Sequence, residues 1–248
     1  MIISTTINDR TVTFDSARII DISIPIDEGP STVNCFYAPP ARFEPVRMGD
    51  FIGDTRLGGA VNFKNVFFNP HGNGTHTECV GHIATEAVRI DQTLDQFLHI
   101  ARVVSVYPTM MDNGDKVVRK ESFEGVEYKG EKAWIIRTLP NPESKKYQHY
   151  TGTNPTYFDP EVMSLLLEMG IEHLLVDLPS VDREEDEGAL ASHHRFWEYP
   201  KKIFVKRTIT ELVYIPDSVT DGLYLLNLLV PAFNLDAAPS RPVLYPML

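Results

Sequence analysis

The 248-residue sequence predicts a mixed α/β fold that is rich in β-strands. Short runs enriched in Val, Ile, Phe and Tyr recur along the chain with turn residues between them, which is typical of strands. The 18 prolines favour strands and loops over a helical bundle, because proline interrupts helices. The chain has no internal repeat and no low-complexity segment, and its length suits one large domain. We therefore expect a single domain over residues 1–248.

Eight segments carry the strand pattern: residues 10–15, 17–26, 60–70, 101–108, 132–139, 173–181, 201–212 and 222–230. Helix signals are fewer, and the clearest covers residues 159–170. Asp159 is placed as its N-cap, Pro160 occupies the first turn, and Gly170 ends it. Apolar residues recur at helical spacing within this segment, so one face should be buried. Shorter helices are predicted at residues 91–98 and 187–198.

The formal net charge of −11 argues against nucleic acid or an anionic membrane as a partner, because both need a basic face. The two cysteines, Cys35 and Cys79, are typical of a reducing compartment and not of a disulfide framework. The sequence shows neither a signal-peptide pattern nor an apolar stretch long enough for a membrane helix. We therefore expect a cytoplasmic protein that acts on a small molecule.

The segment NPHGNGTHTECVGHI, residues 69–83, concentrates metal-capable side chains in a glycine-rich stretch. His76 and Glu78 are two positions apart, so on an extended strand both would lie on one face. His82 would share that face unless a turn at Gly81 redirects it. Imidazole and carboxylate ligands together suit Zn, Mn, Fe or Ni. We interpret the segment as a metal site; the alternative is a glycine-rich turn with surface histidines.

Further ligands must come from other parts of the chain. ASHHRFW supplies His193 and His194, and TITEL supplies Glu211. Each has an alternative explanation when taken singly, because His193 could face solvent and Glu211 could pair with Arg207. A catalytic metal site usually keeps an open position for water, and the ion lowers the pKa of that water so that a nearby base can take its proton.

These residues resemble those of a known family. GTHTECVGH is similar to H-x-G-T-H-x-D-x-P-x-H, the signature of the cyclase family, which includes the metal-dependent bacterial kynurenine formamidases and isatin hydrolases. RIIDISIPI resembles the family's opening strand. VDLPSVDREEDEGALASHHRFW is similar to its D-x-x-S-x-D stretch followed by H-R-x-L, and TELVYI and DAAPSRPVLYPM are similar to its closing parts. The matches keep the same order along nearly the whole chain.

The resemblance implies a swivelling β/β/α fold, a divalent metal (Zn or Mn, one or two ions) and a homodimer or homotetramer. No other cofactor is expected. The residues that it implies are the metal ligands His76, Glu78, His194 and Glu211, the catalytic histidine His82, and the supporting residues Asp177, Ser180 and Asp182. We add His71 as a further candidate metal ligand.

Three positions depart from the signature. Gly72 stands where the family has its first histidine, so His71 can be a ligand only if the loop carries a one-residue bulge. Glu78 replaces the family's aspartate, and its extra methylene moves the carboxylate by roughly 1.5 Å along an extended side chain. Val80 replaces the proline. These changes leave the number of ions and the substrate open.

We predict a metal-dependent hydrolase, of the arylformamidase type, that cleaves the carbon–nitrogen bond of an amide or cyclic amide. His82 would accept the proton of a metal-activated water and later protonate the leaving nitrogen. Phe36 and Tyr37 could line an aryl pocket or pack in the core. Two alternatives are a metal- or small-ligand-binding protein without turnover and a lyase or ring-opening enzyme on the same fold, because a fold does not fix the reaction.

Overall fold

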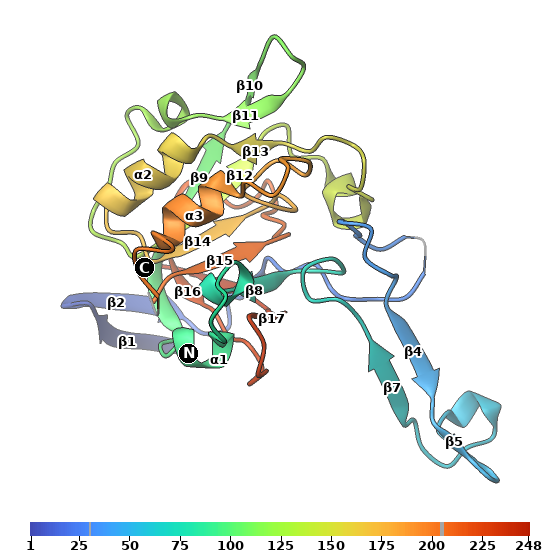
Figure 1. The fold of residues 1–248 in the computed structure, drawn as a ribbon. Coiled ribbons are helices and arrows are strands. Elements are labelled where there is room, and N and C mark those ends of the chain that lie inside the picture. Colours follow the sequence, from blue (N-terminus) through green and yellow to red (C-terminus); the bar gives the residue numbers. More distant parts are fainter. Residues whose placement is uncertain (30, 204–205) are drawn as a thin grey trace.

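A nine-stranded mixed sheet forms the centre of the molecule (Figure 1). The computed structural model describes residues 1–29, 31–203 and 206–248. The strands of this sheet are β3 (Ile20–Asp21), β8 (His76–Glu78), β9 (Leu98–Val106), β12 (Ala133–Thr138), β14 (His173–Val176), β15 (Thr208–Glu211), β16 (Gly222–Asn227), β17 (Ala237–Pro239) and β18 (Val243–Pro246). Their order is β17-β8-β15-β14-β12-β9-β16-β18-β3. The central strands β15, β14, β12 and β9 run parallel, and the flanking strands pair antiparallel.

Alternating side chains of β12 separate two apolar layers. Trp134 and Ile136 pack in the layer that also contains α2 (Pro160–Glu168) and α3 (Ala191–Trp197), whereas Ala133 and Ile135 pack in the layer on the other face. β12 is buried at every position, as expected for a parallel strand covered on both faces. α2 and α3 lie side by side over one face of the sheet (Figure 1).

The helix predicted at residues 159–170 is confirmed as α2. Asp159 accepts a hydrogen bond from the N–H of Glu161 at 2.8 Å and so caps the helix, and Pro160 is its first residue. Gly170 follows the helix with a φ of 74°, a left-handed conformation that glycine adopts without steric cost.

Other predicted elements are shorter in the structure. Instead of residues 91–98, α1 covers only Ile90–Thr93, because Leu98 already belongs to β9. The helix predicted at residues 187–198 is present as α3, which begins only at Ala191. The predicted strand at 201–212 is present as β15 at its end, and residues 204–205 of that prediction lie outside the described residues.

Smaller elements surround the central sheet. β1 (Ile2–Ile7) and β2 (Arg10–Asp15) form a hairpin, and β10 (Thr109–Met110), β11 (Lys116–Val118) and β13 (Tyr157–Phe158) form a three-stranded sheet. The 3₁₀ turns of the described residues are η1 (Thr55–Leu57), η2 (Val80–His82), η3 (Lys120–Phe123) and η4 (Glu143–Tyr147). No helix within the described ranges is long and apolar enough to cross a membrane.

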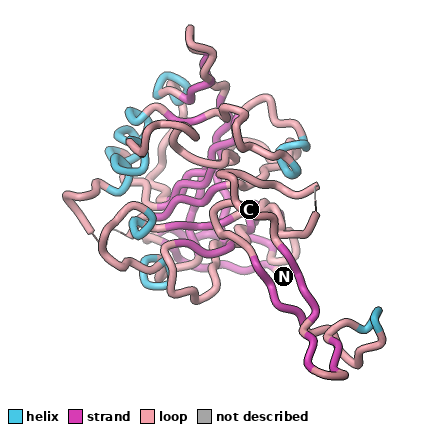
Figure 2. The backbone as a smooth tube through the Cα atoms, turned by 45° about the vertical axis from the view of Figure 1, so that its right-hand side comes forward, coloured by secondary structure: helices cyan, strands magenta, loops and turns pink. Residues whose placement is uncertain are grey.

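An antiparallel extension, residues 42–67, projects away from the rest of the molecule (Figures 1 and 2). We call it the arm. It consists of β4 (Arg42–Pro45) paired with β7 (Lys64–Phe67) and, beyond them, β5 (Arg47–Met48) paired with β6 (Phe51–Ile52). Its exposed large apolar side chains are Met48, Leu57, Val61, Phe63, Val66 and Phe67. The sequence predicted a strand at residues 60–70 but not the projection of this segment.

Candidate metal centre

The candidate site begins on β8, which carries His76 and Glu78 on one face. They are two positions apart on an extended strand, so their side chains project to the same side, as predicted. β8 pairs antiparallel with β15, and this register sets Glu211 opposite His76. His76 Nε2 lies 3.4 Å from Glu211 Oε2, and all three side chains are buried. Two neighbouring strands therefore bring three potential ligands together from distant parts of the chain.

His71 reaches the same cluster from a turn in the loop before β8. The N–H of Gly72 donates to the carbonyl of Asn69, which closes the turn, and His71 Nδ1 lies 3.1 Å from Glu78 Oε2. Gly72 has no room for a side chain, because a Cβ there would lie 2.3 Å from Ala38 Cβ. A histidine at position 72 would not fit, and the turn instead brings the preceding histidine to the cluster.

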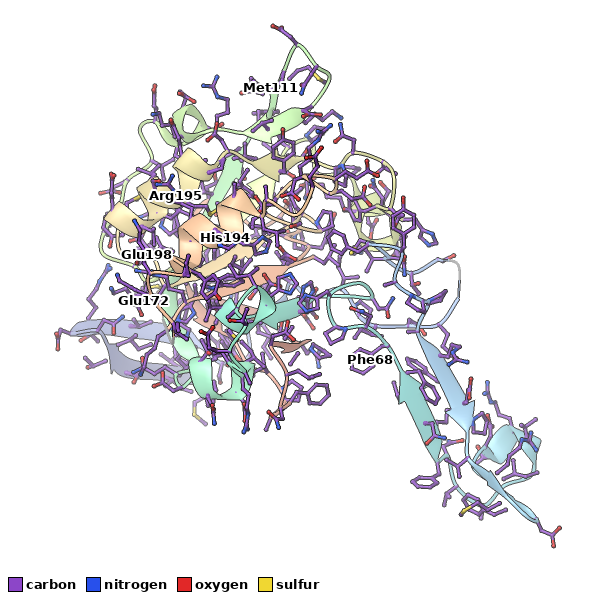
Figure 3. The ribbon with its side chains drawn as sticks, viewed as in Figure 1. Phe68, Met111, Glu172, His194, Arg195 and Glu198 are labelled. Carbon is purple, nitrogen blue, oxygen red and sulfur yellow. The ribbon has the colours of Figure 1, made fainter. Side chains whose placement is uncertain are left out.

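His193, and not His194, is the histidine of α3 that joins the cluster. His193 is buried, and its Nε2 lies 3.1 Å from Glu78 Oε1. His194 Nδ1 instead donates to the carbonyl of Tyr199 at 3.2 Å, and Figure 3 shows His194 on α3. Neighbouring residues of a helix point about 100° apart, so only one of the pair can face Glu78. The structure therefore does not bring His194, the ligand that the sequence predicted, to the cluster, and it brings His193 there instead.

Asp236, which the sequence reasoning missed, closes another side of the cluster. It directly precedes β17, and the pairing of β17 with β8 sets Ala237 opposite Glu78. Asp236 Oδ2 lies 3.0 Å from His71 Nε2 and 3.3 Å from His82 Nδ1. His82 Nδ1 also lies 3.9 Å from Glu78 Oε2. Two carboxylates therefore face the ring of His82.

Of the three residues predicted to support the site, two lie beside the cluster and one does not. Asp182 accepts hydrogen bonds from the ring Nδ1 of His193 at 2.7 Å and from its backbone N–H at 3.0 Å, which fixes the orientation of the imidazole. Ser180 Oγ accepts from the N–H of Asp182 at 3.1 Å. Asp177 instead accepts from Lys145 Nζ at 2.7 Å, in a separate buried pair.

The buried charges of the cluster stabilise one another. Burial works against the charged form of His193, but hydrogen bonds with Asp182 and Glu78 outweigh it and raise the pKa of His193 to about 10. Burial also works against the charged form of His71, but the carboxylates of Asp236 and Glu78 outweigh it and raise the pKa of His71 to about 10. Burial opposes the charged form of Glu78 too, but His82 and His193 hold the pKa of that carboxyl well below its ordinary range. The buried carboxylates thus need a cation beside them, either protonated imidazoles or a metal ion.

Two buried atoms of the cluster lack hydrogen-bond partners, and a bound metal ion would account for them better than protonated imidazoles alone. His76 Nε2 and Glu78 Oε2 are buried and make no hydrogen bond with any described residue; the contact of Glu78 Oε2 with His71 lacks the alignment of a hydrogen bond. An unpaired buried polar atom costs about 1–3 kcal/mol, which a coordinated ion would offset. Three groups have ligand atoms within 4.8 Å of one another: His71, His76 and Glu78; Glu78, His82 and His193; and His71, His82 and Asp236.

A cavity of about 300 Å³ opens beside the cluster. His71, His82, His193 and Glu211 form part of its wall, so a small molecule in the cavity would contact the proposed ligands. Phe36 also lines the cavity, which supports the interpretation that it lines an aryl pocket and does not pack in the core.

Comparison with known proteins identifies the family. Residues 20–183, well over half of the chain, match the model of the family described as Putative cyclase. The chain belongs to this family. A kynurenine formamidase of Bacillus cytotoxicus is 27% identical over 192 residues, which cover 76% of this chain and 82% of that relative.

Solved structures give the same result for the fold of this cyclase-family chain. Isatin hydrolase A from Labrenzia aggregata superposes with a TM-score of 0.64 at 14% identity, over 92% of this chain and 93% of the other. A predicted metal-dependent hydrolase from Bacillus stearothermophilus superposes with a TM-score of 0.63 at 15% identity, over 92% and 97%. The predicted strand-rich α/β fold of the cyclase type is confirmed.

In this cyclase-family site, the sequence offered His193 as a candidate but favoured His194, and it missed Asp236 altogether. His193 precedes Phe196 and Trp197 by three and four positions, and both are buried, so the apolar phase of α3 favoured it over His194. Asp236 carries no comparable signal. It comes to the cluster only through the pairing of β17 with β8, which no local pattern predicts.

Proposed function

We propose that the protein is a metal-dependent hydrolase that cleaves the carbon–nitrogen bond of an amide or cyclic amide, with an aryl formamide as the most suitable test substrate. The observation that carries the proposal is the pair of unpaired buried atoms, His76 Nε2 and Glu78 Oε2, inside a convergent set of imidazoles and carboxylates that opens to a cavity. Membership of the cyclase family and the likeness to a kynurenine formamidase support the choice of reaction.

The donor set suits Zn or Mn, held as one or two ions. His71, His76 and Glu78 would hold one ion, and His193 and Glu211, with Glu78 shared, would hold a second. When bound, the metal would supply Lewis acidity, which lowers the pKa of water and polarises a carbonyl. Asp182 would keep the Nε2 of His193 directed at Glu78 through its hydrogen bond to Nδ1.

His82 is the residue best placed to move protons. It lines the cavity and is 30% exposed, in contrast to the buried His76 and His193. Donation from His82 Nδ1 to Asp236 would leave Nε2 free to accept a proton and return it to a leaving nitrogen. Asp236 would thus act as a positioning residue for the histidine.

The test is elemental analysis of untagged protein together with hydrolysis of formanilide, beside a His76→Ala variant. We expect stoichiometric Zn or Mn and formate release in the wild-type protein, and loss of both in the variant. A His82→Ala variant should keep the metal and lose turnover. Metal without turnover of any amide would instead support the ligand-binding alternative, and amide turnover that survives removal of the metal would overturn the proposal.

We also propose that residues 1–248 act as one domain in the cytoplasm and assemble as a homodimer or homotetramer. Site residues from 71 to 236 meet in one cluster, which supports one domain. The arm supports assembly, because an isolated two-stranded hairpin is at best marginally stable in water and exposed apolar patches mark interaction surfaces.

A further inference from the structure

The cavity beside the metal cluster has one permanent cation in its wall. Arg183 is the single lysine or arginine among the described residues that line it. Arg183 directly follows Asp182, which is hydrogen-bonded to His193, so the backbone at Arg183 is fixed relative to the cluster. A guanidinium stays charged at physiological pH, and its planar fork matches a carboxylate with two parallel hydrogen bonds.

The contacts of Arg183 hold it from one side and leave donors free. Its Nη2 lies 3.4 Å from Asp115 Oδ1 and its Nε lies 3.5 Å from Asn154 Oδ1, both at the long limit for hydrogen bonds. Asp115 is better satisfied by Asn154 Nδ2 and by the hydroxyl of Tyr157, each at 2.8 Å. Arg183 Nη1 has no hydrogen-bond partner in the described part of the chain, and the side chain is 44% exposed. The guanidinium is therefore oriented but not neutralised by a strong ion pair.

The two acidic side chains next to Arg183 in the wall are engaged by backbone N–H groups. Both carboxylate oxygens of Glu184 lie 3.0 Å from the N–H of Gly152. Asp186 accepts from the N–H groups of Gly188, at 2.9 Å, and Leu190, at 2.6 Å. These carboxylates shape the loop after Arg183, and neither forms an ion pair with it among the described residues.

Apolar surface accompanies this cation in the cavity wall. Phe36, which is 38% exposed, and Leu190 both line the cavity. Both also have left-handed backbones, with φ of 56° and 42°, which cost a non-glycine residue on the order of 1 kcal/mol or more. Such strain persists where the surrounding structure imposes it, and it often occurs in ligand-binding walls.

We propose that Arg183 is a specificity-determining residue that binds a carboxylate on an aryl amide substrate. The aryl group would contact Phe36 and Leu190, and the scissile amide would lie at the metal cluster. The inference rests on the proposed function and adds the substrate class to it: anionic aryl amides over neutral ones.

The test compares two substrates of nearly the same shape, the anionic 4-formamidobenzoate and the neutral 4-formamidobenzamide, by the release of formate. A hydrogen-bonded contact with a charged group contributes about 1.5–3 kcal/mol, so Arg183→Gln should raise the KM for the benzoate about tenfold to a hundredfold. The kcat for the benzoate and both constants for the benzamide should change less than about twofold. Arg183→Lys should recover part of the loss, because the charge remains but the two-pronged geometry does not.

Arg195→Gln is the matched control. It removes the same charge from an exposed position of α3 that lies outside this cavity, labelled in Figure 3. We expect it to leave the kinetic constants of both substrates unchanged. Equal use of the two substrates by the wild-type protein, or an equal loss for both in Arg183→Gln, would overturn the role of Arg183 and leave the proposed hydrolase intact.

A binding experiment separates this inference from the proposed function. Calorimetric titration of Mn-loaded protein with 4-aminobenzoate and 4-aminobenzamide reports on the cavity even if no amide is hydrolysed. We expect the benzoate to bind at least about tenfold more tightly, and Arg183→Gln to remove that preference. A preference that survives in Arg183→Gln would mean that the carboxylate binds at the metal cluster, and it would overturn the inference.

Discussion

The metal cluster buries ionisable side chains, whereas the arm exposes apolar ones. In the cluster, His76, Glu78 and His193 are ionisable and buried, whereas in the arm Phe63 and Val66 are apolar and more than half exposed. Unpaired buried polar atoms cost about 1–3 kcal/mol each, and exposed apolar surface forgoes about 25 cal/mol per Å² of burial. We therefore propose that a bound ion completes the first region and that another protein surface covers the second.

The largest effect is expected for the two adjacent histidines of α3. His193→Gln removes an imidazole 3.1 Å from Glu78 Oε1 and takes one of the cationic partners from a buried carboxylate. We expect metal affinity to fall about tenfold to a hundredfold, with loss of turnover. His194→Gln is the matched variant, because His194 hydrogen-bonds only to the carbonyl of Tyr199 within the described structure, and it should change metal affinity less than about twofold.

Competition with a chromogenic chelator measures both affinities. If His194→Gln lost the metal and His193→Gln retained it, the position of the site on α3 would be wrong. If both retained it, the cluster around β8 alone would hold the ion, and His193 would be needed only to balance the charge of Glu78.

Local patterns predicted the part of the site that a single strand presents. His76 and Glu78 share a face because side chains alternate along any strand, so their spacing was sufficient evidence. His193 required the phase of a helix whose start was predicted four residues too early. Asp236 required knowledge of strand pairing between residues more than 150 positions apart. The site was thus predictable where geometry is local and not where the sheet assembles it.

The same distinction holds for the fold. The cap at Asp159 and the stop at Gly170 located α2 closely, because both act within one helical turn. The arm could not be predicted in this way. Its strands pair like others, and what differs is that the described chain leaves more than half of Phe63 and Val66 exposed. Burial depends on the whole molecule, so a sequence with strand character does not reveal whether its strand is covered or projects into solvent.

A smaller effect is expected where the loop turns before β8. Gly72→Ala would set a Cβ 2.3 Å from Ala38 Cβ, and overpacking of this kind lowers the free energy of unfolding by about 1–3 kcal/mol. The double variant Ala38→Gly, Gly72→Ala removes the clash and should recover most of that loss, as measured by urea unfolding. Additive losses in the double variant would show that the two residues do not conflict, and that another constraint keeps glycine at position 72.

The smallest effect on the chain itself is expected in the arm. Val66→Glu places a charge on an exposed apolar position of β7, so it should change the fold little, by about 0.5 kcal/mol or less. If the arm is covered by a second copy, the same change buries a charge in that interface, and sedimentation equilibrium should show a lower mass. Asn65→Asp adds an equal charge at the exposed neighbouring position and should have the weaker effect on mass, because strand neighbours point to opposite faces. An unchanged mass in Val66→Glu would mean that the Val66 face of β7 does not join the copies, which would contradict assembly through this face and leave the metal cluster unaffected.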